Sequence, residues 1–153
     1  IDTVGTDHCS FDFGGAKQLG RDDFSKIPNG IPGVEHRPVL LYTAGVAAGR
    51  ITAYQLMKLL SEQPARLFGM YPAKGALSVG SDADVVIYDP NSTDRITSAG
   101  QHQNVDYTPY EGMETAGRIH MVLLSGEVAV DCGSVVLPNR GRFVRRGPSG
   151  FWR

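Results

Sequence analysis

The spacing of hydrophobic residues changes near Pro72, from the period of helices to the period of strands. Upstream, residues 34–46 place apolar side chains at helical spacing, and Thr52 with Gln55 has the form of a capping box that begins a second helix. A further short helix is predicted over residues 63–69. The chain is therefore expected to be of the α/β class, with its helices ahead of its sheet.

Short β-branched or alternating runs, separated by turn residues, follow Pro72 and predict strands. They cover residues 83–89, 95–97, 121–130 and 134–137. Pro90-Asn91 is expected to stop the first strand, and Ser125-Gly126 to form a two-residue hairpin turn. Residues 98–117 carry no clear pattern. Together these runs predict part of a small β-sandwich or a meander.

The first third of the chain combines a short apolar run with a long irregular segment. Residues 1–7 predict a short buried strand, and Ile1 in place of Met leads us to expect a processed chain or a piece of a longer one. Residues 9–33 are dense in Gly, Asp and Pro, and loops of this length in compact domains are usually functional or disordered. The phenylalanines in this loop predict that it packs against another part of the protein.

Composition excludes several classes of protein. With 153 residues, 41% hydrophobic and 20% charged, and a net charge of -1, the chain is expected to be a soluble domain rather than a disordered, collagen-like or strongly basic nucleic-acid-binding one. Two cysteines, Cys9 and Cys132, suit a reducing cytoplasm. The arginine-rich tail from Arg140 to Arg153 is interpreted as a solvated arm or a contact with a sister subunit, in preference to a nucleic-acid site.

The most suggestive polar cluster is Thr6-Asp7-His8-Cys9. A nucleophilic Cys–His pair is disfavoured, because adjacent residues of a strand point to opposite faces. A closed zinc site is also disfavoured, since the other histidines are scattered. Two interpretations stay open, namely Asp7 as a turn residue and Asp7 as one ligand of a metal site completed elsewhere; spacing alone favours the turn. Asn29, in Pro28-Asn29-Gly30, is likewise either a plain turn residue or a donor and acceptor for an imide.

Several segments in the same order resemble the dihydropyrimidinase and hydantoinase family of cyclic-amide hydrolases. They are Asp2–Phe11, Asp23–Gly30, Pro72–Gly75, Val79–Asp84, Val105–Tyr107 and Tyr110–Met113. Lys-Gly followed by Val-Gly-Ser-Asp-Ala-Asp marks only the wider amidohydrolase superfamily, whereas Thr-Asp-His-Cys and Ile-Pro-Asn-Gly narrow the resemblance to this family. The resemblance implies a C-terminal fragment of a (β/α)₈ TIM barrel, from strand 8 onward, plus part of a β-sandwich domain. It divides the chain into 1–75 (barrel), 76–139 (sandwich) and 140–153 (basic tail, in contact with another subunit).

The same resemblance implies the chemistry of the site. In this family two zinc ions are bridged by hydroxide and by a carboxylated lysine. Asp7 matches the carboxylate that binds one metal and acts as the catalytic base, and Asn29 matches the residue whose main chain binds the substrate. The carboxylated lysine and the histidine ligands are expected upstream of Ile1, so the chain alone is expected to be inactive.

The implied activity of the whole protein is the opening of dihydropyrimidines or 5-substituted hydantoins to N-carbamoyl amino acids. A related allantoinase or dihydroorotase is one alternative. Another is a non-catalytic scaffold of the collapsin response mediator type, which lacks the metal-binding Asp and the Pro-Asn-Gly asparagine; the presence of both Asp7 and Asn29 favours an enzyme. A free-standing β-rich binding module is a third. The resemblance also implies a homotetramer that acts on a small cyclic amide, and the cysteine content predicts that it is cytoplasmic.

Overall fold

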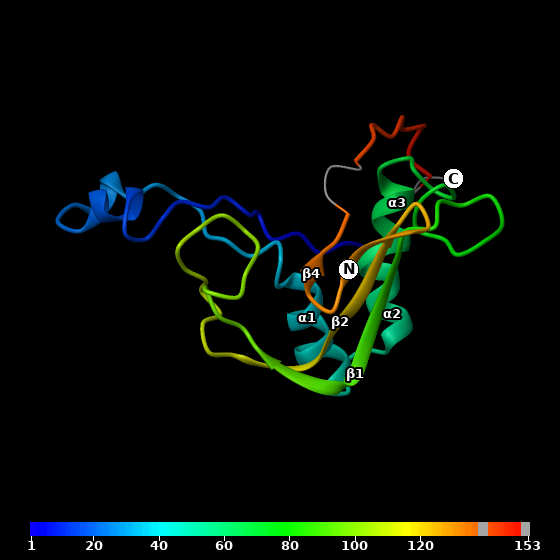
Figure 1. Cartoon of the computed structure of the whole chain (residues 1–153). Coiled ribbons are helices and arrows are strands. Elements are labelled where there is room, and N and C mark those ends of the chain that lie inside the picture. Colours follow the sequence, from blue (N-terminus) through cyan, green and yellow to red (C-terminus); the bar gives the residue numbers. More distant parts are fainter. Residues whose placement is uncertain (138–140, 151–153) are drawn as a thin grey trace.

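The computed structural model describes residues 1–137 and 141–150 and sets a helical layer against a four-stranded antiparallel sheet (Figure 1). The strands are β1 Val85–Arg95, β2 Glu114–Leu124, β3 Glu127–Asp131 and β4 Ser134–Val135. They lie in the sheet in chain order, β1-β2-β3-β4, as a meander does. The predicted α/β class and the order of helices before strands are confirmed.

The helices lie where the sequence predicts them. They are α1 Arg37–Leu41, α2 Ala53–Met57 and α3 Gln63–Leu67, with π-helical turns at Tyr42–Ala47 (η3) and Lys58–Glu62 (η4). The capping box is present, because Thr52 Oγ1 accepts from Gln55 N at 3.1 Å while Thr52 N donates to Gln55 Oε1 at 2.8 Å. The third helix is not separate, since α2, η4 and α3 form one continuous run. A widened turn before Pro64 accommodates a residue that has no N–H to donate.

The helical layer is fixed to the sheet by one aromatic pair and one side-chain hydrogen bond. The rings of Tyr42 and Tyr88 lie 4.3 Å apart between centroids, and the Tyr88 hydroxyl donates to Ala116 O at 2.7 Å. Thr43 Oγ1 accepts from Ala116 N at 3.0 Å. Gly117 has φ +79°, and a Cβ there would lie 2.5 Å from Tyr88 Cε1, so only glycine allows this packing. Burial raises the pKa of Tyr88 to about 12.

The strand boundaries differ from the prediction at Pro90. The pairing of β1 with β2 shifts register between Asp89 and Thr93, so Pro90 lies in a bulge where its missing N–H costs no ladder hydrogen bond. The strand therefore continues to Arg95, and the separate strand predicted at 95–97 is absent, since Ile96 and Thr97 follow the end of β1. β2 begins at Glu114, within the segment that carries no clear pattern.

Two tight turns set the register of the later strands. Ser125 and Gly126 have φ +52° and +84°, and Cys132 and Gly133 have φ +46° and +83°. Positive φ at both central residues is the mark of the type I′ turn, whose twist matches that of the flanking strands. The predicted Ser125-Gly126 hairpin is confirmed.

Residues 1–33, here called the arm, extend away from the sheet (Figure 1). The predicted buried strand at residues 1–7 is wrong, because no strand of the described residues pairs with it, and Ile1 is 103% exposed. The arm contains two short 3₁₀ helices, η1 Ala16–Gly20 and η2 Phe24–Lys26. Of the phenylalanines expected to pack, Phe13 lies beside Tyr107, with their ring centroids 5.6 Å apart, while Phe24 is 87% exposed.

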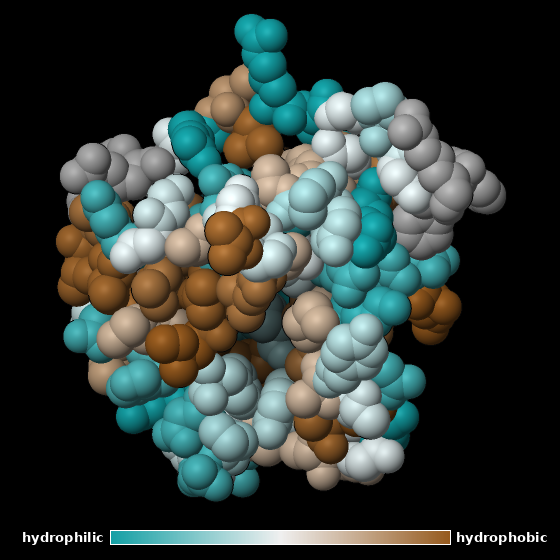
Figure 2. Space-filling model, turned by 90° about the vertical axis from the view of Figure 1, so that its right-hand side faces the viewer, coloured by the Kyte–Doolittle hydropathy of each residue, from teal (hydrophilic) through white to brown (hydrophobic). Residues whose placement is uncertain are grey.

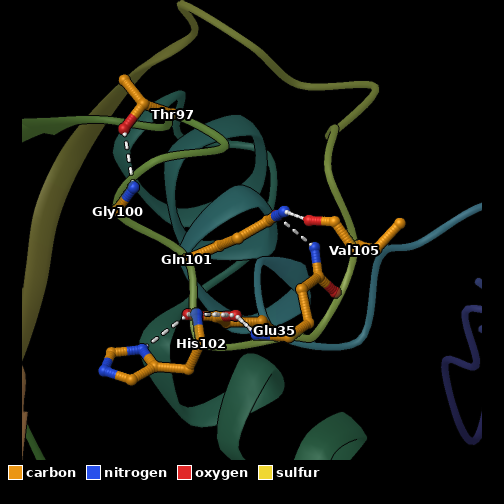
Figure 3. Close-up of polar contacts among 7 residues, drawn as sticks. Glu35, Thr97, Gly100, Gln101, His102 and Val105 are labelled. Carbon is orange, nitrogen blue, oxygen red and sulfur yellow. Dashed lines mark hydrogen bonds and ion pairs between the residues drawn. The ribbon is translucent and has the colours of Figure 1, made fainter. Parts of the chain in front are cut away.

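Glu35, just before α1, holds the long loop of residues 97–112 between β1 and β2 (Figure 3). Its carboxylate accepts from His102 N at 2.8 Å and from Gln103 N at 2.9 Å, and lies 2.9 Å from His102 Nδ1. Partial burial alone would raise the pKa of Glu35, but the hydrogen bonds from the His102 ring and from these two amides outweigh it and lower that pKa.

The described part of the tail lies along α3. Gly147 N donates to Gly69 O at 2.8 Å, Gly150 N donates to Arg66 O at 3.0 Å, and Arg142 pairs with Asp82 at 2.7 Å. Arg140 and Arg153 of the predicted basic tail lie outside the described residues. No described helix is long and apolar enough to cross a membrane.

Much of the chain's apolar surface is uncovered. The accessible surface is 10307 Å², whereas a compact protein of this mass exposes about 7,600 Å². Among the described hydrophobic residues the buried core consists of Ala65 and Ile96, while Leu77 is 82% and Val86 59% exposed. On the face shown in Figure 2, the largest group of hydrophobic residues lies left of centre, and others lie apart from it at the top, the right and the lower right. The described fold therefore depends on hydrogen bonds and on a few close contacts more than on a large core.

Replacing Thr52 by alanine should lower the free energy of unfolding by about 1 kcal/mol, because it removes the capping bond at the start of α2. Urea unfolding followed by circular dichroism measures this change. Thr52→Ser keeps the hydroxyl and should retain most of the stability. An alanine variant as stable as the wild type would contradict the role of the cap.

Replacing Glu35 by glutamine should lower the free energy of unfolding at neutral pH by about 1–2 kcal/mol, because charge-assisted hydrogen bonds are lost. The pKa of Glu35 in the folded chain lies below its ordinary value of 4.5, so the advantage of the wild type is complete above that pH. It should disappear as pH falls through the lower folded-state pKa. Urea unfolding at several pH values tests this, with Asp2→Asn as control; a difference that is constant with pH would contradict it.

Candidate functional site

The two segments that carry the predicted site residues run side by side in the arm. Cys9 N donates to Ile31 O at 3.2 Å, and His8 Nδ1 accepts from Gly33 N at 3.1 Å and Val34 N at 3.3 Å. Asp7 immediately precedes His8 in the first segment, and Asn29 lies two residues before Ile31 in the second. The fold thus brings together two stretches that are about twenty residues apart in the sequence.

Asp7 has φ +50°, in the left-handed region, and its side chain is exposed. Aspartate is several-fold enriched in this conformation among non-glycine residues, which fits its interpretation as a turn residue. Left-handed backbone at a residue other than glycine costs on the order of 1–3 kcal/mol and clusters at functional sites. An exposed carboxylate on a constrained backbone also suits a ligand, so the geometry accommodates both interpretations.

Asn29 is exposed in an irregular segment, where no hydrogen-bonded turn of the expected kind is present, and Gly30 lies close against the Asp7 segment. Gly30 has φ +110°, and a Cβ there would lie 2.5 Å from the carbonyl oxygen of Cys9 and 2.6 Å from its Cβ. Only glycine permits so close an approach. The backbone on the C-terminal side of Asn29 is therefore held against the segment that follows Asp7.

His8 has a structural contact that the sequence did not reveal. Because Nδ1 accepts hydrogen bonds from two backbone amides, the neutral ring carries its proton on Nε2, and Nδ1 is not free to act as a base. This agrees with the prediction that His8 and Cys9 do not form a nucleophilic pair. No local pattern could have revealed the contact, since its donors lie 25 and 26 residues away.

Asp106 joins the arm to the 97–112 loop. Its carboxylate accepts from Phe13 N at 2.6 Å and from Gly14 N at 2.8 Å. Hydrogen bonds from these two amides lower the pKa of Asp106, so it stays charged at neutral pH. Sequence reasoning placed Asp106 within a family motif but gave it no role.

The described residues do not form a metal site on their own. Among them no group of three or more His, Cys, Asp or Glu side chains lies close enough to hold an ion. Cys132 Sγ lies 3.6 Å from His120 Nδ1, but a hydrogen bond with Asp131 raises the pKa of the thiol, which disfavours the thiolate that a metal or a nucleophilic reaction needs. Asp7 can offer one oxygen ligand and would need partners from other residues.

Comparison with known proteins gives a consistent result. The amidohydrolase family matches residues 1–129. The chain is 47% identical to D-phenylhydantoinase of Escherichia coli O139:H28 over 97% of its own length and 32% of that protein. It thus spans about a third of the length of the curated relatives it matches.

Solved structures agree. D-hydantoinase (dihydropyrimidinase) from Thermus sp. superposes with a TM-score of 0.92 at 47% identity, over 99% of this chain and 33% of that one. L-hydantoinase (dihydropyrimidinase) from Arthrobacter aurescens superposes with a TM-score of 0.83 at 35% identity, over 90% and 30%. Members of the amidohydrolase family are generally metal-dependent. With most of its length matched by the family and its backbone superposing on these enzymes, the chain belongs to the amidohydrolase family.

Proposed function

We propose that the protein to which this chain belongs is a metal-dependent hydrolase that opens cyclic amide rings, with dihydropyrimidines or 5-substituted hydantoins as substrates and N-carbamoyl amino acids as products. The observation that carries this proposal is the 47% identity to a D-phenylhydantoinase across 97% of the chain. The side-by-side placement of the Asp7 and Asn29 segments supports it.

We assign Asp7 two tasks, as a metal ligand and as the proton acceptor. A pair of divalent ions, taken here to be Zn²⁺, supplies Lewis acidity and lowers the pKa of bound water. The Asp7 carboxylate accepts the proton of the attacking water and returns it to the ring nitrogen as that nitrogen leaves. We propose that the other ligands, among them a carboxylated lysine, come from outside the described residues, in which no group of three or more potential ligands lies together.

Asn29 is proposed to bind the imide edge of the substrate through its main chain. An imide offers two carbonyl acceptors and one N–H donor, which a backbone N–H and C=O can match. The constrained glycine after Asn29 supports this role, because a fixed backbone binds a planar ring without first being ordered.

We further propose the architecture that the family resemblance implies. Residues 1–75, which contain the helices, belong to the end of a (β/α)₈ barrel, and residues 76–139, which contain the sheet, to a β-sandwich. The uncovered apolar surface supports packing against further protein. The tail of residues 140–153 is assigned to a subunit contact within a homotetramer, and the exposed free cysteines suit the cytoplasm.

Replacing Asp7 by asparagine should lower kcat for ring opening by about 10²–10⁴-fold, because the amide cannot take up a proton. The assay uses the longest polypeptide that contains this chain, with dihydrouracil and hydantoin as substrates and bound zinc measured in parallel. The matched control is Asp22→Asn, which changes another exposed aspartate of the arm and should leave kcat unchanged.

Full activity of the Asp7→Asn variant would remove Asp7 from the mechanism. A wild-type polypeptide that binds no zinc and opens neither ring would instead favour a non-catalytic scaffold. Activity on allantoin or dihydroorotate alone would move the protein to one of the related enzymes.

A further inference from the structure

Lys17 holds the carbonyl groups on both sides of Asn29. Its Nζ donates to Pro28 O at 2.5 Å and to Gly30 O at 2.6 Å. We propose that Lys17 is a positioning residue that sets the orientation of the Asn29 main chain toward the substrate. This inference rests on the substrate-binding role of Asn29 proposed above, and it adds a residue that neither the sequence motifs nor the ligand set includes.

Lysine suits this task chemically. An ammonium group has three donors and no acceptor, so one Lys17 side chain can bind two converging carbonyl oxygens at once. Hydrogen bonds from a charged donor are roughly twice as strong as those between neutral groups. Lys17 is half-buried, which strengthens them further, and its Nζ also lies 5.7 Å from the centre of the Phe11 ring.

The direction of the two carbonyls determines the direction of the Asn29 amide. The Pro28–Asn29 peptide is trans, and in a trans peptide the C=O and the N–H point to opposite sides. Because Pro28 O points toward Lys17, the N–H of Asn29 points away from it, free to donate to a substrate carbonyl. The hydrogen bond from Lys17 to Gly30 O fixes the Gly30–Ile31 peptide in the same way, so the backbone on either side of Asn29 has little freedom to rotate.

Lys17 is itself held in place by the body of the protein. It lies in η1, where Lys17 N donates to Asp12 O at 3.1 Å. Phe13 and Gly14, which follow Asp12, donate their backbone N–H groups to the Asp106 carboxylate of the 97–112 loop. A continuous set of polar contacts therefore runs from this loop to Asn29, although the arm extends away from the sheet (Figure 1).

The first measurement is the ¹⁵N order parameter of the Asn29 amide in the longest polypeptide that contains the chain. In the wild type it should be near the value of about 0.85 that is typical of rigid backbone, and in Lys17→Met it should fall toward about 0.6. Lys17→Arg keeps two donors and the charge and should restore most of the rigidity. Lys26→Met, at an exposed lysine of the same arm that pairs with Asp23, should change nothing.

The second measurement is steady-state kinetics of the same variants in the longest polypeptide that contains the chain, with dihydrouracil as substrate. Lys17→Met should raise KM about tenfold while kcat changes less than about threefold, because the residue orients a binding group and does not touch the reacting atoms. Lys17→Arg should lower KM again. A loss of folding alone would not give this separation of KM from kcat, nor its rescue by arginine.

The two measurements separate the possible failures. An unchanged order parameter in Lys17→Met overturns the positioning role, whatever the activity. A lowered order parameter with an unchanged KM shows that Lys17 orders a segment that does not bind substrate, which overturns the inference and the role of Asn29 together. If the wild type has no activity, the proposed function fails, and the order parameter still decides whether Lys17 fixes the backbone at Asn29.

Discussion

The antiparallel pairing of β1 with β2 is the interaction on which the rest of the structure depends. It joins Val85 to Leu123 and Arg95 to Glu114, and so brings the two ends of a long intervening loop together. The helices pack on the same pair of strands through Tyr42 and Tyr88, and the side chain of Thr43 binds an amide of β2. Without this ladder neither the helical layer nor the loop would have a fixed position.

Charged side chains that bind backbone amides extend this order outward to the arm. The Glu35 carboxylate accepts hydrogen bonds from the backbone amides of His102 and Gln103 in the 97–112 loop. Asp106, further along that loop, accepts from the amides of Phe13 and Gly14. Such contacts are directional, so they can fix the position of an exposed segment that has little apolar surface to bury. The position of the candidate site therefore depends on charged hydrogen bonds made by residues that are not part of it.

The sequence predicted those features that local chemistry determines. The capping box at Thr52 and the type I′ turn at Ser125-Gly126 need only neighbouring residues, and both are present. Pro90 does not end its strand as predicted, because whether a proline ends a strand depends on whether the pairing with the partner strand bulges there. The strand expected at residues 1–7 failed for a related reason, since a strand needs a neighbour that local pattern does not supply.

For the candidate site, motif resemblance predicts Asp7 and Asn29 but gives no account of what holds them. The binding of Lys17 to two carbonyls and of Asp106 to two amides joins residues that are 11 to 93 positions apart. Neither pairing has a fixed spacing or a periodic signal. Such contacts become visible only when the chain is folded, because geometry and not composition selects the partner.

The two-residue turns also determine where the chain can change in length. One residue added at Ser125-Gly126 would have to be taken up by a bulge beside the turn, because a one-residue shift of the strand register turns side chains to the opposite face of the sheet. The 97–112 loop has no such restriction, and the entropic cost of lengthening a loop grows only with the logarithm of its length. Yet this loop carries Asp106, so an insertion there would shift the arm and with it the Asn29 segment. The length of the loop thus sets the position of the Asn29 backbone, with every residue of the candidate site unchanged.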